Sequence, residues 1–114
     1  MSADCLFCRI FSGEISAQEV RRTDDVLVFR DTKPQAPTHL LVIPKRHVRD
    51  LGDFVAEAPP GEVGALLKIA GEAGRAAAPG GYRVVTNEGV DAGQTVRHLH
   101  FHVLGGRAMQ WPPG

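Results

Sequence analysis

The sequence predicts one α+β domain over residues 1–114, with a mainly antiparallel sheet, and three observations support this prediction. Short apolar runs of strand length are joined by turns, as hairpins require, so parallel crossovers are not needed. Two other segments have apolar residues at helical spacing. The length of 114 residues suits a single domain that buries only about two-thirds of its unfolded surface, so a dimer would add stability.

The first predicted element is a short helix over residues 6–11, where four apolar residues have helical spacing and Ser12-Gly13 supplies a stop. Residues 26–29 and 39–43 are rich in valine, leucine and isoleucine and are therefore predicted to be strands. The proline-rich residues 34–37 connect these two strands. We therefore expect a hairpin in the first half of the chain.

A longer helix is expected to begin at Pro59-Pro60-Gly61 and to end before Pro79-Gly80-Gly81, because apolar residues recur between them at three- and four-residue steps. Three glycines interrupt it, at Gly64, Gly71 and Gly74. Each glycine costs about 1 kcal/mol relative to alanine, which indicates close approach of another backbone. A partner helix across a dimer axis is one explanation, and drift on an exposed helix face is the other.

The last two predicted strands cover residues 82–86 and 98–104, and the second carries alternating histidines. In an extended strand these imidazoles lie on one face, while the apolar residues between them face the core. The histidines are His98, His100 and His102, and the apolar residues are Leu99, Phe101 and Val103. The outer imidazoles start roughly 13 Å apart, so at most two of the three can bind one metal ion.

A neutral imidazole is a good nucleophile near neutral pH, since its unperturbed pKa is about 6.5. The middle residue, His100, is the best placed for attack, while His98 and His102 would orient it or contact the oxygens of an electrophile. His39, at the start of another predicted strand, would complete such a relay. A lone histidine more often decorates a solvated sheet face, but three at period two favour the catalytic interpretation.

The loop before this strand, residues 87–95, combines glycines with an amide and a hydroxyl, at Gln94 and Thr95. Such groups are short donors suited to phosphate oxygens. A phosphate bound here would lie next to the predicted nucleophile. A plain surface turn is the alternative for the loop taken alone.

Thirteen basic and thirteen acidic residues give a formal net charge of +0, so no broad electric field favours nucleic acid or an anionic membrane as a partner. No apolar run approaches the length of a bilayer span, and no signal-peptide core begins the chain. We therefore expect a soluble, cytoplasmic protein that holds any anion locally.

The two cysteines form the motif Cys5-Leu6-Phe7-Cys8, which is too short to join distant parts of the chain. This spacing indicates a reduced compartment and metal or redox use. Two thiolates two residues apart supply half of a tetrahedral zinc site and need two more ligands. A metal-free packed helix and a thioredoxin-like redox pair are the alternatives.

These motifs resemble the histidine triad (HIT) superfamily, whose signature alternates histidines with apolar residues as residues 98–103 do. Other segments look like its nucleotide-binding, or Hint, branch, and the resemblance covers nearly the whole chain. These segments are residues 4–8, 34–39, 42–45, 87–89 and 105–114. The resemblance implies a HIT-like homodimer of α+β subunits, each with about five strands, a short N-terminal helix and one longer helix.

The resemblance also implies that the protein binds purine nucleoside monophosphates such as AMP and hydrolyses the P–N bond of adenosine 5′-phosphoramidates, including lysine-linked and aminoacyl-type adenylates. His100 would attack the α-phosphorus to give a nucleotidyl-histidine, which water then cleaves. His102 and His98 would orient and polarise the reacting groups, and His39 would support the proton network. This chemistry requires no metal or organic cofactor.

The positions that match the family's nucleotide contacts are spread along the chain. Asp31 would accept hydrogen bonds from the ribose hydroxyls, since an ionised carboxylate is a pure acceptor. Phe29 would bracket the base, while Arg30 departs from the histidine expected beside the base in animal members. The phosphate contacts would be made by Asn87, Gly93, Gln94 and Thr95, in addition to His100 and His102. Thr95 stands where many relatives carry serine.

Two further expectations come from the resemblance. Trp111 lies in a proline- and glycine-rich tail and would reach the other subunit's active site; a hydrophobic anchor for the tail is the alternative. His47 and His98 are the matching candidates to complete a structural zinc site with Cys5 and Cys8, which would support the triad from behind. Other members of the branch lack this site.

Three other functions stay open. Cleavage of dinucleoside polyphosphates would use the same nucleophile with a different leaving group, although the Trp-Pro-Pro-Gly tail argues against it. A nucleotide-binding adaptor would bind purine nucleotides with only incidental turnover, so its cellular role would survive loss of His100. A zinc-dependent interaction module would depend on Cys5 and Cys8 instead.

Overall fold

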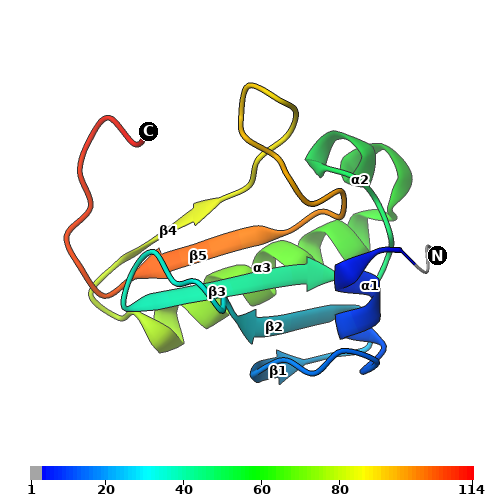
Figure 1. The fold of residues 1–114 in the computed structure, drawn as a ribbon, viewed down its shortest axis with the longest axis horizontal. Helices are drawn as coiled ribbons and strands as arrows, with labels where there is room; N and C mark the ends of the chain where they lie inside the picture. The colour runs from blue at the N-terminus through cyan, green and yellow to red at the C-terminus, as the bar shows by residue number, and fades with distance from the viewer. Residues whose placement is uncertain (1–3) are drawn as a thin grey trace.

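The centre of the fold is one five-stranded antiparallel sheet, seen in a computed structural model that describes residues 4–114 (Figure 1). Its strands are β1 (Glu19–Arg22), β2 (Val26–Arg30), β3 (Thr38–Pro44), β4 (Tyr82–Val85) and β5 (Phe101–Gly105). They lie in the order β1-β2-β3-β5-β4, and all four neighbouring pairs are antiparallel. The α+β prediction is therefore confirmed.

Three helices accompany the sheet: α1 (Leu6–Phe11), α2 (Leu51–Glu57) and α3 (Pro60–Ala77). Helix α3 runs along one face, while α1 lies at one end of the other face (Figure 1). No helix within residues 4–114 is both long and apolar enough to cross a bilayer. The two faces of the sheet therefore have different covers, a long helix on one and a short helix with the N-terminal segments on the other.

Each face of the sheet has its own apolar core, and strand β2 contributes to both. Its Val26 and Val28 belong to the core with α3, whereas Leu27 and Phe29 belong to the core with α1. Because alternate side chains of a strand point to opposite faces, a strand covered on both sides is apolar throughout. This explains why residues 26–29 lack the polar alternation of a half-exposed strand.

The predicted hairpin is confirmed, because β2 and β3 pair antiparallel from Val26 opposite Pro44 to Arg30 opposite Leu40. Both predicted helices are also found where expected. Helix α1 ends before Ser12, and Gly13 then adopts a φ of +85°, which favours glycine. Helix α3 begins at Pro60. Proline has no backbone N–H, but the N–H groups in the first turn of a helix have no partner within the helix, so proline is well tolerated there.

Two elements were not predicted. All four residues of β1 are exposed, and its sequence Glu-Val-Arg-Arg has no apolar alternation. Helix α2 is short and buries only Phe54, so its apolar periodicity is weak. It is defined instead by its N-cap, Asp50, whose carboxylate accepts a hydrogen bond from the Asp53 backbone at 2.9 Å.

The strand predicted over residues 98–104 is partly wrong, because β5 begins only at Phe101. The preceding residues bond to the last residue of β3 and to the loop after it, and they form no strand ladder. The Leu99 N–H donates to the Val48 carbonyl at 2.8 Å, and His98 Nε2 lies 2.9 Å from the Pro44 carbonyl. The apolar alternation is nevertheless correct, since Leu99, Phe101 and Val103 all lie in the core with α3.

Two of the three glycines predicted to interrupt α3 face an aromatic side chain of the same subunit. A Cβ added at Gly74 would lie 2.4 Å from the Tyr82 ring, and the Tyr82 hydroxyl donates to the Gly71 carbonyl at 3.1 Å. The close neighbour of Gly71 and Gly74 is therefore an aromatic side chain of the same chain, and the approach of a partner helix across a dimer axis stays a prediction. A Cβ at Gly64 would meet no described atom within 4 Å.

Candidate active site

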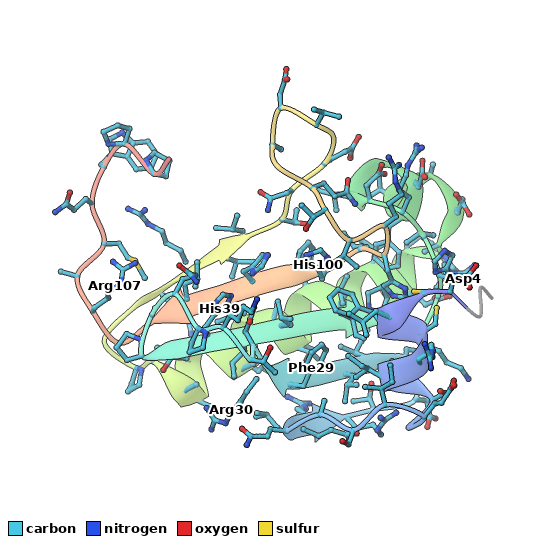
Figure 2. The ribbon with its side chains drawn as sticks, in the orientation of Figure 1. Asp4, Phe29, Arg30, His39, His100 and Arg107 are labelled. Atoms are coloured by element: carbon cyan, nitrogen blue, oxygen red, sulfur yellow. The ribbon has the colours of Figure 1, made fainter. Side chains whose placement is uncertain are left out.

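His100 lies on the sheet face opposite α3, at the entrance to β5 (Figure 2). Its side chain is 9% exposed. The His102 ring lies 5.1 Å from the His100 ring, and the Phe7 ring of α1 meets His100 edge-on at 5.0 Å. The structure thus brings together the middle and last histidines of the motif under the edge of α1.

The hydrogen bond of His100 fixes its neutral tautomer. Nδ1 lies 2.8 Å from the His98 backbone carbonyl, which can only accept a hydrogen bond. Nδ1 therefore carries the ring proton, and Nε2 keeps its lone pair. A neutral imidazole held in this way presents Nε2 as a nucleophile.

A second chain of hydrogen bonds fixes His39 and His102. The Gln35 backbone N–H donates to His39 Nδ1 at 3.0 Å, so the ring proton of neutral His39 lies on Nε2. That Nε2 lies 2.9 Å from His102 Nδ1 and 3.4 Å from Asp31 Oδ2. His39 thus donates to His102 Nδ1, and His102 is left with its own proton on Nε2.

Burial keeps both rings of this chain neutral. It lowers the pKa of His102 to about 4, with smaller contributions from the nearby His100 and His39, while the Asp31 carboxylate opposes the shift. Burial also lowers the pKa of His39, again against the influence of Asp31. At neutral pH His102 is therefore an uncharged N–H donor beside His100.

Asp31 and Phe29, the residues predicted to hold ribose and base, lie close to this group. Asp31 Oδ1 accepts a hydrogen bond from the Lys33 backbone at 2.8 Å. Asp31 also lines an open cavity of about 510 Å³, and the exposed Arg30 forms another part of its wall. Phe29 is buried and meets Phe7 edge-on at 5.9 Å, so it supports the site from below.

The predicted phosphate loop is held in shape by two of its own side chains. Gln94 Nε2 donates to the Arg49 carbonyl at 2.6 Å and to the Val96 carbonyl at 3.1 Å, and its oxygen accepts from the Gly89 backbone at 3.1 Å. Glu88 accepts from the Gly52 backbone at 2.8 Å. Both donor hydrogens of Gln94 are thus engaged within the protein, so its amide shapes the loop.

The other predicted phosphate contacts differ in their surroundings. Asn87 is half-buried at the start of the loop, and Gly93 has a φ of +80°, where a residue with a side chain would be strained. Thr95 is exposed and lines a cavity of about 380 Å³ next to the start of α1. The exposed Thr95 therefore presents its hydroxyl to the cavity, whereas the Gly93 N–H already donates to the Val90 carbonyl at 3.0 Å.

Trp111 lies in the C-terminal tail and is 82% exposed. Its described neighbour is Arg83 of β4, whose guanidinium lies 5.9 Å from the centroid of the indole ring and also donates to the Gln110 carbonyl. The tail therefore presents an uncovered indole at the sheet edge formed by β4.

The other imidazole of the motif, His98, faces a separate cluster with Cys5, Cys8 and His47. His98 Nδ1 lies 3.2 Å from Cys5 Sγ, 3.5 Å from Cys8 Sγ and 3.2 Å from His47 Nδ1, and Cys8 Sγ lies 3.3 Å from His47 Nδ1. All four ligand atoms are within 4.8 Å of one another. The ring of His98 thus lies with the three other residues that the family resemblance grouped with it, and its role in orienting the reacting groups stays a prediction.

The donor set of the cluster fits a tetrahedral zinc ion. Neighbouring ligand atoms around zinc are separated by about 3.3 Å for two nitrogens and about 3.6 Å for nitrogen and sulfur, close to the separations found. His98 Nε2–H donates to the Pro44 carbonyl, so its Nδ1 lone pair is directed into the cluster. Burial lowers the pKa of His98 to about 4, which keeps this lone pair available.

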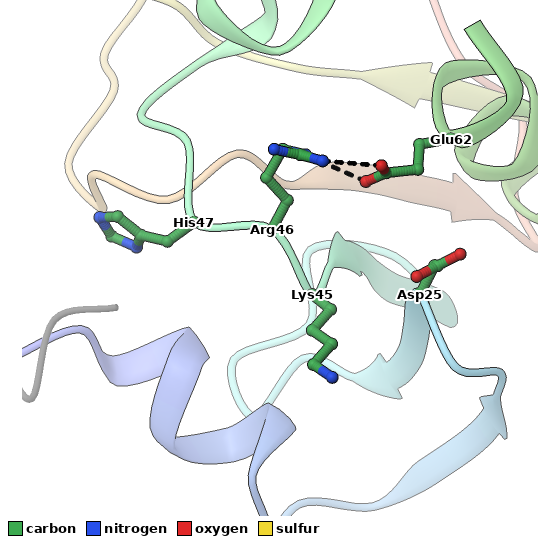
Figure 3. A pocket seen from close by; sticks show the side chains of 5 residues that line it. All are labelled: Asp25, Lys45, Arg46, His47 and Glu62. Carbon is green, nitrogen blue, oxygen red and sulfur yellow. Dashed lines mark hydrogen bonds and ion pairs between the residues drawn. The ribbon is translucent and has the colours of Figure 1, made fainter. Parts of the chain in front are cut away.

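His47 also borders a second open cavity, on the far side of the loop after β3 (Figure 3). This cavity of about 460 Å³ includes Arg46 and Glu62, which form a bidentate ion pair with N–O distances of 3.0 and 2.8 Å. Of the two cationic side chains in this wall, Arg46 and Lys45, that of Arg46 is therefore already neutralised by an acidic partner.

Sequence reasoning missed three groups of this site. Phe7 covers His100, the Gln35 backbone fixes His39, and Val48 anchors the peptide between His98 and Leu99. Two of these act through backbone atoms, which carry no side-chain signature. Phe7 was predicted only as an apolar residue of the first helix.

Comparison with known proteins places these features in one family. The model of the HIT domain matches residues 12–109. A HIT-like protein of Synechococcus elongatus is 46% identical over 114 residues, covering 100% of both chains. A HIT-like protein of Azospirillum brasilense is 47% identical over 106 residues, covering 91% of this chain and 87% of its own.

Solved structures agree with the sequence matches. A HIT family hydrolase from Legionella pneumophila is 45% identical, with a TM-score of 0.90 and coverage of 97% of this chain and 100% of that chain. A histidine triad protein from Clostridium difficile is 37% identical, with a TM-score of 0.85 and coverage of 96% of each chain.

Proposed function

The chain belongs to the HIT domain family, and we propose that it is a purine nucleoside phosphoramidase that hydrolyses the P–N bond of adenosine 5′-phosphoramidates. The observation that carries the proposal is the fixed tautomer of His100, whose Nδ1–H is bound by the His98 carbonyl while Nε2 keeps its lone pair. The relative from Legionella pneumophila is described as a hydrolase, which supports a hydrolytic reaction.

The first step is attack of His100 Nε2 on the α-phosphorus. A bond forms between Nε2 and phosphorus, and the P–N bond to the amine breaks. The leaving nitrogen takes up a proton from solvent, while neutral His102, held in place by His39, donates a hydrogen bond from its Nε2–H to the reacting phosphate group. The products of this step are the free amine and a nucleotidyl-histidine.

In the second step, water attacks the phosphorus of the nucleotidyl-histidine. The bond between phosphorus and His100 breaks, AMP is released and His100 returns to its neutral form. The attacking water gives up a proton to solvent, which balances the proton taken up in the first step, so the two steps together consume one water and return every catalytic group to its starting state. No step needs a metal or organic cofactor.

The nucleotide is held by the residues around this pair. Asp31 accepts hydrogen bonds from the ribose hydroxyls, and Phe29 supports the base. Phosphate oxygens are contacted by Asn87 and Thr95, and by Gly93 through an N–H that it shares with the Val90 carbonyl. Because both donor hydrogens of Gln94 are engaged within the loop, we assign Gln94 to shaping the loop and not to direct phosphate contact.

We also propose a homodimer in which Trp111 lies near the partner's active site. Strand β4 is an edge of the sheet, and its exposed Val84 lies in an apolar hollow of about 300 Å³ with exposed residues of α2 and α3. These are Leu51, Val55 and Leu67. A second copy would cover this hollow and pair the free edge of β4.

A structural zinc ion held by Cys5, Cys8, His47 and His98 is part of the proposal. When bound, the ion would join the N-terminal helix, the loop after β3 and the histidine segment. His98 would hold that ion through its ring, and its backbone carbonyl accepts the Nδ1–H of His100. The metal site therefore positions the nucleophile without entering the reaction.

The test of the proposed function is release of amine from adenosine 5′-phosphoramidate by the wild type and by His100→Ala, with diadenosine tetraphosphate assayed in parallel. We expect release that resists brief chelator treatment and falls by at least about a thousandfold in His100→Ala. Consumption of the tetraphosphate alone would replace the proposal with polyphosphate cleavage. Nucleotide binding without turnover of either substrate would indicate a binding protein.

A further inference from the structure

One cavity beside the candidate active site has a wall that the proposed reaction does not use. This cavity, of about 380 Å³, lies between the first residues of α1 and residues 95–97. Figure 2 shows Asp4, one of the residues that line the cavity, at the α1 end of the molecule. Its wall is formed by Asp4, Cys5, Leu6, His47, Thr95, Val96 and Arg97.

Arg97 is the basic residue of this wall, and its guanidinium differs from those nearby. Among residues 4–114 no hydrogen bond or ion pair is formed by its side chain. By contrast, Arg49 pairs with Asp50 at 3.0 Å, and Arg46 pairs with Glu62 at 2.8 Å (Figure 3). Arg97 thus offers donors suited to bidentate recognition of a carboxylate or phosphate.

The cavity also adjoins the place where the proposed phosphate would lie. Thr95, two residues before Arg97, lines the same cavity. On the opposite wall, Leu6 precedes Phe7, whose ring lies 5.0 Å from that of His100. A group attached to the phosphate at Thr95 would therefore extend into this cavity, past the edge of α1, and come within reach of Arg97.

The charges of the cavity distinguish between two kinds of anionic group. Its basic side chains are those of His47, which belongs to the Cys/His cluster, and Arg97. One carboxylate matches the single positive charge of Arg97, whereas a polyphosphate chain carries several negative charges that one guanidinium leaves unpaired.

We propose that this cavity binds the leaving group, and that Arg97 pairs with a carboxylate on it. The substrates favoured by this chain are then nucleoside phosphoramidates formed on an amine of an amino acid that keeps its carboxylate free. This inference rests on the proposed function for the position of the phosphate. Arg97 acts here on specificity, because it contacts the leaving group and not the reacting phosphorus.

The experiment compares two substrates that differ only in this charge: AMP joined through its phosphate to the side-chain nitrogen of lysine, and the same compound as the lysine methyl ester. The wild type is expected to have a kcat/KM roughly 3- to 10-fold higher for the free acid. Arg97→Gln is expected to remove this preference while keeping turnover of the ester. Arg75→Gln, an exposed arginine on α3, serves as the matched control and keeps the preference.

Binding of the same two compounds is also measured in the His100→Ala background, with and without Arg97→Gln. One outcome would separate this inference from the proposed function. If the protein binds the free acid more tightly than the ester through Arg97, but the wild type turns over neither compound, the inference is retained and the proposed function is overturned. Equal kcat/KM values for acid and ester in the wild type would overturn the inference. An equal fall in kcat/KM for both compounds in Arg97→Gln would also overturn it. Efficient cleavage of diadenosine tetraphosphate that depends on Arg97 would assign the cavity to phosphate instead.

Discussion

Backbone groups set the chemistry of the histidines at the scale of single residues. The His98 carbonyl accepts a hydrogen bond from Nδ1–H of His100, and the Gln35 N–H donates a hydrogen bond to His39 Nδ1. The alternation of histidines in the sequence predicted which imidazoles take part, but it could not predict their tautomers. Their hydrogen-bond partners are main-chain atoms, which every residue carries.

The first prediction concerns the charge of His102. Because burial lowers its pKa to about 4, we expect nitrogen NMR to show a neutral ring from pH 8 down to about pH 5. The Asp31 carboxylate raises this pKa, so Asp31→Asn should lower it further. Protonation of His102 near pH 6.5 in the wild type would contradict the assigned relay.

The same shift has a consequence for stability. The unfolded chain binds a proton at His102 near pH 6.5, whereas the folded chain does so only near pH 4. The folded state thus binds fewer protons in this window, and the free energy of unfolding should fall as the pH drops from about 6.5 towards 4. Urea unfolding at several pH values measures this. His102→Asn should show a weaker dependence on pH.

At the scale of elements, the loop after β3 and the segment before β5 act as one unit. The peptide between His98 and Leu99 is held at both ends, since its N–H donates to Val48 and its carbonyl accepts from His100. Apolar periodicity predicted a strand from residue 98 because the side-chain directions are those of a strand. Apolar periodicity shows which side of the sheet a side chain faces, but it does not show which backbone groups form hydrogen bonds between strands. The start of β5 at Phe101 could therefore not be predicted from it.

Loss of the metal cluster should therefore affect the nucleophile. Cys8→Ser is expected to abolish tight zinc binding and to lower kcat by roughly tenfold, with a smaller change in KM. Metal content, kcat and the nitrogen NMR signals of His100 are measured together. Ser12→Ala, at the end of the same helix, is the control. A variant that loses zinc yet keeps kcat and the His100 signals would contradict this link.

At the scale of the whole molecule, the parts with strong apolar patterns were predictable and the exposed parts were not. The hairpin of β2 and β3 and the long helix α3 follow from their apolar residues, while β1 is exposed throughout and left no such signal. The cysteine spacing alone indicated two of the four residues in the Cys/His cluster that is proposed to hold zinc. His47 and His98 were assigned to this cluster from the family resemblance, because residues that are distant in sequence form no short motif whose spacing indicates a metal site.

The proposed dimer can be tested at its edge strand. Val84 of β4 is 44% exposed, and Val84→Asp would place a charge in the apolar hollow that a second copy should cover. We expect a dimer for the wild type and a shift towards monomer for Val84→Asp in light scattering. Val20→Asp is a matched control on the opposite edge strand, where valine is 46% exposed, and should stay dimeric. A monomeric wild type would contradict the proposal.

The most direct test of the central claim is the identity of the covalently modified residue. Wild-type protein is mixed with adenosine 5′-phosphoramidate, quenched rapidly at alkaline pH, and the peptide containing residues 98–104 is analysed by mass spectrometry. The account predicts a nucleotidyl group on His100 that appears with amine release and is absent in His100→Ala. Amine release with the nucleotidyl group on another residue, or with no modified residue in the wild type, would contradict it.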